Sequence, residues 1–205
     1  MNRELLLAIY RDPLYKLDGC TDPEEFRLRR KLAQFNTQRL AQIAEAHDQV
    51  LVLPRLTANM TEDEYAQLRR QAWAETTRNT IDRYEDDHLV LPRLRDARGH
   101  EQHRELLWQA NNPQTSAMVG EQWWQRCILP EARTLTTFDQ YETLSSAMDV
   151  FVLSSRDRRR VTLARFHDLR LILPQLWRAS SKVEFDTLRG QAESEWGQKA
   201  GRALA

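Results

Sequence analysis

Apolar residues recur along the chain in a pattern that restarts several times. Four segments share three apolar residues followed by a proline, at Pro54, Pro92, Pro130 and Pro174. Seven residues after each proline comes a small residue, at Thr61, Gly99, Thr137 and Ser181. A motif that returns at a constant spacing is typical of repeat proteins, in which each unit buries its apolar face against the next unit.

The small residues also mark predicted helix starts. Thr61 with Glu64 fits the capping box, in which a hydroxyl accepts a hydrogen bond from the third helical amide and the Glu side chain bonds back. The pairs Thr137 with Gln140 and Ser181 with Glu184 fit it too, and Asp22 before Pro23 is an earlier start. Aromatic, apolar and small residues follow most starts at offsets of 4, 7 and 11, which lie on one helix face.

We therefore predict an all-α chain of helical repeats of about 38 residues, arranged as a short solenoid or a compact helical bundle. The single domain comprises a half-unit 1–21, repeat units 22–60, 61–98, 99–136 and 137–180, and a C-terminal capping helix 181–205. Each unit is a long kinked helix or a helical hairpin that stops at its Leu-Pro sequence. The alternative is that the apolar triplets are short buried β-strands, because such runs look alike in sequence.

Composition narrows the class of protein. The 205 residues carry 30 Lys+Arg and 30 Asp+Glu, so the zero net charge gives no overall attraction for nucleic acid or acidic lipid. Two cysteines, Cys20 and Cys127, are too few for a disulfide-stapled secreted domain, and we expect both to be inert buried thiols. Since the sequence also shows neither a secretory signal nor a membrane-spanning apolar run, we expect a soluble cytoplasmic protein.

Motifs for catalysis are missing from the sequence, including a glycine-rich phosphate loop and His-Glu-x-x-His. His100 and His103 have a spacing that would let them share a metal, but zinc needs more ligands and His103 falls on the apolar stripe. Residues 84–88 form an acidic segment that we interpret as a solvated helix face. We predict no enzymatic activity, no cofactor and no metal, with an enzyme site assembled from distant residues as the alternative.

Tryptophan and arginine dominate the energetics of protein interfaces, and the chain has six tryptophans. Trp123 and Trp124 point about 100° apart on a helix, so we expect at least one to be partly exposed unless a wide apolar face buries both. Trp177 falls in a connector and is expected at the surface. The densest basic segment lies in the extra residues of the fourth unit and contains Arg156, Arg158, Arg159 and Arg160.

These seven residues are the predicted contacts of a non-enzymatic protein-binding module. We expect it to act as an adaptor, scaffold or inhibitor of a larger bacterial protein machine, with another protein as partner and no membrane. The alternative is a nucleic-acid-binding accessory protein that uses residues 156–170, because arginines neutralise phosphates.

Overall fold

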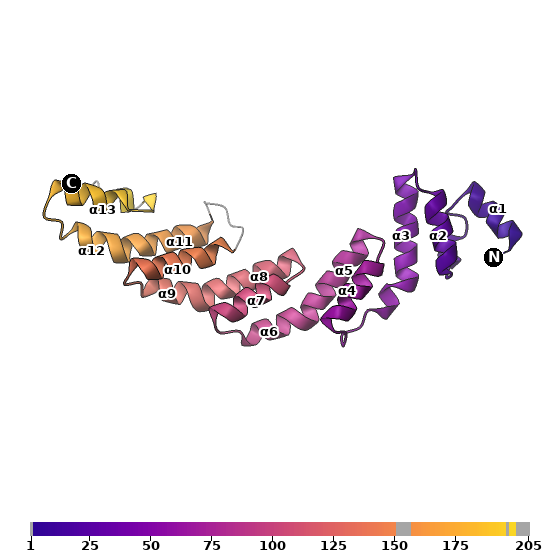
Figure 1. Ribbon diagram of the computed structural model, residues 1–205, viewed down its shortest axis with the longest axis horizontal. Helices are drawn as coiled ribbons and strands as arrows, with labels where there is room; N and C mark the ends of the chain where they lie inside the picture. Colours follow the sequence, from indigo (N-terminus) through magenta and orange to yellow (C-terminus); the bar gives the residue numbers. More distant parts are fainter. Residues whose placement is uncertain (1, 151–156, 196, 200–205) are drawn as a thin grey trace. The chain divides into compact units, whose positions relative to one another are not determined.

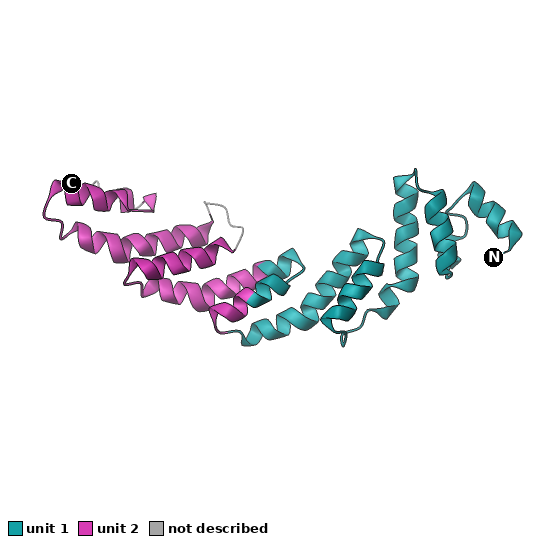
Figure 2. Ribbon diagram, viewed as in Figure 1, with its two compact units in different colours: residues 1–97, 105–116 teal, residues 98–104, 117–205 magenta. Residues whose placement is uncertain are grey.

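The computed structural model describes residues 2–150, 157–195 and 197–199. Within these residues the regular elements are all helices, and there is no β-strand (Figure 1). The predicted all-α class is confirmed, and the alternative of strands at the apolar triplets is wrong. The chain divides into two compact units, residues 1–97 with 105–116 and residues 98–104 with 117–205 (Figure 2). The boundaries predicted within a single domain stay a prediction.

The first unit is built from neighbouring helices joined by short turns. Its elements are α1 (Arg3–Arg11), η1 (Leu17–Gly19), α2 (Pro23–Leu32), α3 (Thr37–Leu51), η2 (Leu53–Arg55), α4 (Glu62–Gln71), α5 (Glu75–Glu85), η3 (Asp86–Val90) and α6 (Leu91–Asp96). Helix α2 lies beside α3, and α4 lies beside α5 (Figure 1). Phe26 and Ile43 join one buried cluster, and Tyr65, Leu68 and Ile81 join the next.

Two helices, α7 (His100–Gln109) and α8 (Pro113–Trp123), contribute residues to both units. The second unit continues with η4 (Trp124–Ile128), α9 (Leu129–Arg133), α10 (Phe138–Asp149), α11 (Arg158–His167), η5 (Asp168–Ile172), α12 (Leu173–Leu176) and α13 (Lys182–Gly190). Helix α10 packs on α11, and α12 packs on α13. Ile172, Leu176 and Leu188 form a buried cluster near the end of the described chain.

The predicted helix starts are confirmed. Asp22, Thr61, Thr137 and Ser181 are N-caps whose side chains accept a hydrogen bond from a backbone amide of the first turn. Thr61 and Thr137 form complete capping boxes with Glu64 and Gln140. Helix α7 begins directly after Gly99, the remaining small residue that marks a predicted start. The helix starts are therefore encoded locally, whereas the repeat length of about 38 residues stays a prediction.

Replacing Thr61 with alanine should lower the free energy of unfolding by about 1 kcal/mol, because an amide of the first turn of α4 loses its acceptor. The measurement is the urea midpoint followed by circular dichroism. Thr80→Ala is the control, since Thr80 is exposed inside α5, where its hydroxyl bonds only the Thr76 carbonyl. Equal midpoints for the two variants would show that the Thr61 cap does not stabilise the helix.

The helices do not stop at Leu-Pro in most units, so that prediction is wrong there. A π-helical turn of five residues ends two positions before Pro92, Pro130 and Pro174, and a short α-helix then contains each proline. In the first of these turns the Leu91 amide donates to the Asp86 carbonyl, five residues back. In an α-helix the proline ring would clash with the carbonyl four residues back, and the wider π turn relieves this clash.

Candidate functional site

Three buried aspartates occupy the position six residues before a proline. Asp48, Asp86 and Asp168 are completely buried, and each carboxylate accepts hydrogen bonds from two consecutive backbone amides. The amides belong to Trp73 and Ala74, to Asn111 and Asn112, and to Glu193 and Ser194, at 2.7–3.0 Å. These carboxylates satisfy amides at the turn of the following helical pair, so they link successive pairs. The sequence carries a signal for these contacts, because an Asp stands six residues before three of the four repeated prolines.

The predicted repeat 99–136 lacks this aspartate and has Trp124 six residues before its proline. The loop that would supply the matching amides is the longer one after α10, and its residues 151–156 lie outside the described part of the chain. The substitution of Asp by Trp therefore coincides with the change in loop length. Trp124 is 5% exposed and Trp123 is 2% exposed, so the expectation that one of them is exposed is wrong.

A histidine directly precedes two of these aspartates, and its imidazole contacts the carboxylate of the aspartate. His47 Nδ1 lies 2.7 Å from Asp48 Oδ1, and its ring stacks on Trp73 at a centroid distance of 3.7 Å. His167 Nδ1 lies 2.9 Å from Asp168 Oδ1. Both imidazoles are buried. Each His–Asp pair is thus part of the packing between neighbouring helices.

Asp168 also accepts a hydrogen bond from the Ser194 hydroxyl, which brings Ser, His and Asp together. In a nucleophilic triad the hydroxyl must bond to the imidazole that removes its proton. Here the hydroxyl donates to the carboxylate, so the cluster does not have the geometry of a triad. Burial by itself would raise the pKa of Asp168, but the hydrogen bonds from His167, Ser194 and the two amides lower it below the ordinary value.

His100 and His103 make separate contacts. The His100 Nδ1 atom accepts a hydrogen bond from Trp123 Nε1, and His100 Nε2 lies 2.9 Å from Glu131 Oε1. His103 Nδ1 lies 2.8 Å from the Gly99 carbonyl, and burial lowers the pKa of His103. Among the described residues, no group of three or more His, Cys, Asp or Glu side chains converges as metal ligands would.

Both cysteines are buried, and burial raises the pKa of each thiol. The Cys127 thiol donates to the Arg98 carbonyl at 3.3 Å, while its sulfur lies 3.8 Å from His103 Nδ1. A reactive cysteine needs a lowered pKa and a base that accepts its proton. The environment of Cys127 instead favours the neutral thiol.

The predicted basic segment is partly neutralised by acids of the same chain. Arg159 bonds to Asp157, and Arg160 Nη2 lies 2.7 Å from Asp149 Oδ1. Arg158 is exposed, and Arg156 lies outside the described residues. Trp177, the remaining predicted contact, is 76% exposed at the end of α12, as expected for a connector residue.

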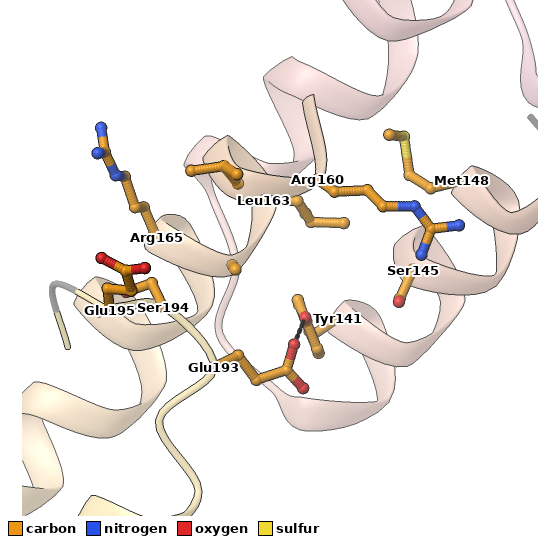
Figure 3. A pocket seen from close by; sticks show the side chains of 11 residues that line it. Tyr141, Ser145, Met148, Arg160, Leu163, Arg165, Glu193, Ser194 and Glu195 are labelled. Carbon is orange, nitrogen blue, oxygen red and sulfur yellow. Dashed lines mark hydrogen bonds between the residues drawn. The ribbon is translucent and has the colours of Figure 1, made fainter. Parts of the chain in front are cut away.

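A cavity of about 540 Å³ lies between α10, α11 and residues 193–195 (Figure 3). The Tyr141 hydroxyl donates to the Glu193 carboxylate in its wall, and Arg160, Ser145 and Met148 lie further along it. Burial, and then the hydrogen bond and charge of Glu193, raise the pKa of Tyr141. The phenol therefore stays protonated, which suits it to hold Glu193 in place but not to act as a general base.

A second cavity, of about 820 Å³, lies in the first unit between α4, α5 and the end of α7. It is lined by Glu85, which is 7% exposed, and by Trp108, which is 78% exposed and was not among the predicted contacts. The prediction of a solvated acidic face over residues 84–88 is wrong at Glu85 and Asp86. Both are buried because they occupy the offsets that face the neighbouring helices in the other units.

The Glu85 carboxylate lacks a hydrogen bond or ion pair with any residue that the structure describes. Burial, and then the negative charges of Asp86, Glu62 and Asp82, raise the pKa of Glu85 to about 7, while Arg69 has the opposite effect. The Arg69 Nε atom itself lies 2.7 Å from Asp82 Oδ1. Glu85 is therefore a titratable group at neutral pH in the wall of an open cavity.

No protein-family model, curated protein or solved structure matches this chain. Among the described helices, none has the length and apolar character needed to cross a membrane.

Proposed function

We propose that this chain is a non-enzymatic protein-binding module that acts as an adaptor, scaffold or inhibitor of a larger bacterial protein machine. The observation that carries the proposal is the exposure of two indoles, Trp108 at 78% and Trp177 at 76%. Tryptophan is the residue type most enriched at the energetic centres of protein interfaces, and a free indole in water gains nothing for folding. Trp177 thus stays an expected contact, and Trp108 replaces the buried Trp123 and Trp124.

The use of the chemically reactive side chains supports the same proposal. The His–Asp pairs fasten turns to neighbouring helices, and the two thiols are buried in their neutral form. The Ser194 hydroxyl is held by a carboxylate instead of a base. Groups that could have served chemistry are engaged in holding the helices together.

The test is affinity capture from the source organism with the wild-type chain and with Trp108→Ala and Trp177→Ala variants. We expect at least one variant to lose a protein that the wild type retains, with binding of the purified partner weakened at least tenfold, because interface tryptophans commonly contribute about 2 kcal/mol or more. Val183→Ala is the control, since it truncates another highly exposed apolar side chain. Equal capture of the same purified partner by all four proteins would refute the role of the indoles.

Nucleic-acid binding through residues 156–170 stays a prediction from sequence. The ion pairs of Arg159 and Arg160 do not favour it, because these arginines already have carboxylate partners. Specific phosphate binding would show an affinity that falls steeply with salt and is lost on charge reversal at Arg158.

A further inference from the structure

Glu85 departs from the residue type that the other predicted repeats have at the same position. Seven residues before the four repeated prolines, the chain has His47, Glu85, Trp123 and His167. The three aromatic rings pack against other rings, since His47 stacks on Trp73, Trp123 on His103, and His167 lies 4.2 Å from Tyr141. Only the predicted repeat 61–98 has a carboxylate at the position where the other three repeats fill the space between helical pairs with a ring.

A largely buried carboxylate without a partner destabilises a folded chain, because the water in an open cavity solvates its charge less well than bulk water does. Two of the three arginines that line the cavity already have acceptors within the first unit. Arg69 of α4 lies against Asp82, and Arg78 of α5 bonds to Glu75 and to the Ala72 carbonyl. The unpaired charge therefore has no structural use within the first unit, which suggests a ligand.

The charges that act on Glu85 favour a cation, because the negative charges of Asp86, Glu62 and Asp82 outweigh the positive charge of Arg69. The other charged residues that line the cavity are Glu62 and Arg70 on α4 and Glu105 on α7, which pairs with Arg93. The carboxylate of the adjacent Asp86 bonds to two backbone amides and raises the pKa of Glu85. The exposed Trp108 indole adds an aromatic face, and aromatic faces attract cations within about 6 Å of the ring.

We propose that this cavity binds an arginine side chain of the partner protein, with the Glu85 carboxylate as its counter-ion and the Trp108 indole stacked on the guanidinium. The planar guanidinium donates two parallel hydrogen bonds to a carboxylate and stacks on aromatic rings, which suits both groups. This inference rests on the proposed function, because it assumes that the partner is a protein. A metal ion is a poor occupant, since the described residues offer no set of three converging ligands.

Binding of the cation requires the ionised form of Glu85. Since the pKa of Glu85 is about 7 in the free chain, the affinity should rise as the pH increases from 6 to 8. The stability of the free chain should change in the opposite direction. A raised pKa means that the folded state binds the proton more tightly than the unfolded state, so stability falls as the pH rises from about 4.5 to about 7.

The probe is the blocked peptide acetyl-Gly-Arg-Gly-amide, titrated at pH 8 while the indole resonance of Trp108 is followed by NMR. Glu85→Gln should weaken binding at least tenfold and abolish its rise with pH. The matched control is Asp87→Asn, which removes one negative charge from an exposed position two residues away, outside the cavity, and should leave the affinity unchanged. Glu85→Gln should also be more stable than the wild type at pH 8 but not at pH 5, which shows that the variant is folded.

Equal affinity of the wild type and Glu85→Gln for the peptide would overturn the inference. Tighter binding of spermidine than of the peptide, with the same dependence on Glu85, would overturn the assignment to a protein side chain in favour of a free polyamine. Partner capture that depends on Trp177 but survives Glu85→Gln would overturn the cavity's role alone and leave the protein-binding proposal standing. Loss of capture when either Trp177 or Glu85 is replaced, but not in Asp87→Asn, supports both the cavity's role and the protein-binding proposal.

Discussion

Replacing Arg29 with alanine should lower the free energy of unfolding by about 4 kcal/mol, the largest effect that we expect from one substitution. Arg29 is completely buried in α2, where its guanidinium pairs with Glu25 and donates to the carbonyls of Pro13 and Tyr15 at 2.8 and 2.7 Å. Its loss leaves a buried carboxylate and two carbonyls without donors. The substitution also removes the hydrogen bonds that hold the segment before α2 against this helix.

The measurement is equilibrium unfolding in urea, with Arg27→Ala as the matched control. Arg27 lies on the same helix but is exposed, and its ion pair with Glu24 is at the surface, so its loss should change stability by less than about 0.5 kcal/mol. The double variant Glu25→Gln with Arg29→Met should recover part of the loss, because it removes the unpaired charge as well. Similar unfolding curves for Arg29→Ala and Arg27→Ala would contradict this account of α2.

Asp86→Ala should lower the free energy of unfolding by about 3 kcal/mol, because two partly buried amides lose their acceptor. The Asp86 carboxylate accepts from the Asn111 amide at 3.0 Å and the Asn112 amide at 2.8 Å, at the turn between α7 and α8. Hydrogen exchange at these two amides should accelerate together with the loss of global stability. Asp48→Ala and Asp168→Ala test the equivalent links in the other pairs.

The control for Asp86 is its neighbour Asp87, which has the same side chain but is exposed. Asp87→Ala should leave the unfolding midpoint within about 0.5 kcal/mol of the wild type. Unchanged exchange at Asn111 and Asn112 in Asp86→Ala would show that these amides find another acceptor and that the carboxylate is not the link between the helical pairs.

Helix starts were predictable because their interactions are local. The Thr61 hydroxyl accepts from the Glu64 amide and the Glu64 carboxylate accepts from the Thr61 amide, so four residues of sequence contain both partners. Helix ends were less predictable. A proline normally ends a helix, but the π turns before Pro92, Pro130 and Pro174 let it continue for several residues.

The candidate site depended on contacts between residues distant in sequence. Asp86 meets amides 25 and 26 residues away, and nothing in its own helix announces that pairing. Trp123 was predicted as a possible surface residue because it adjoins another tryptophan, yet His100 and His103 of another helix cover it. Glu85 looked like part of a solvated face because its neighbours in sequence are also acidic.

The sequence by itself determined the helical class, the residues at which helices begin, and the offsets that every unit shares, because these follow from hydrogen bonds and side-chain spacing within a few residues. Only the tertiary structure decided which polar groups are buried and which of them remain unpaired. Burial is a property of the neighbouring helices, so one motif position is a packed ring at His47 and an unpaired carboxylate in an open cavity at Glu85.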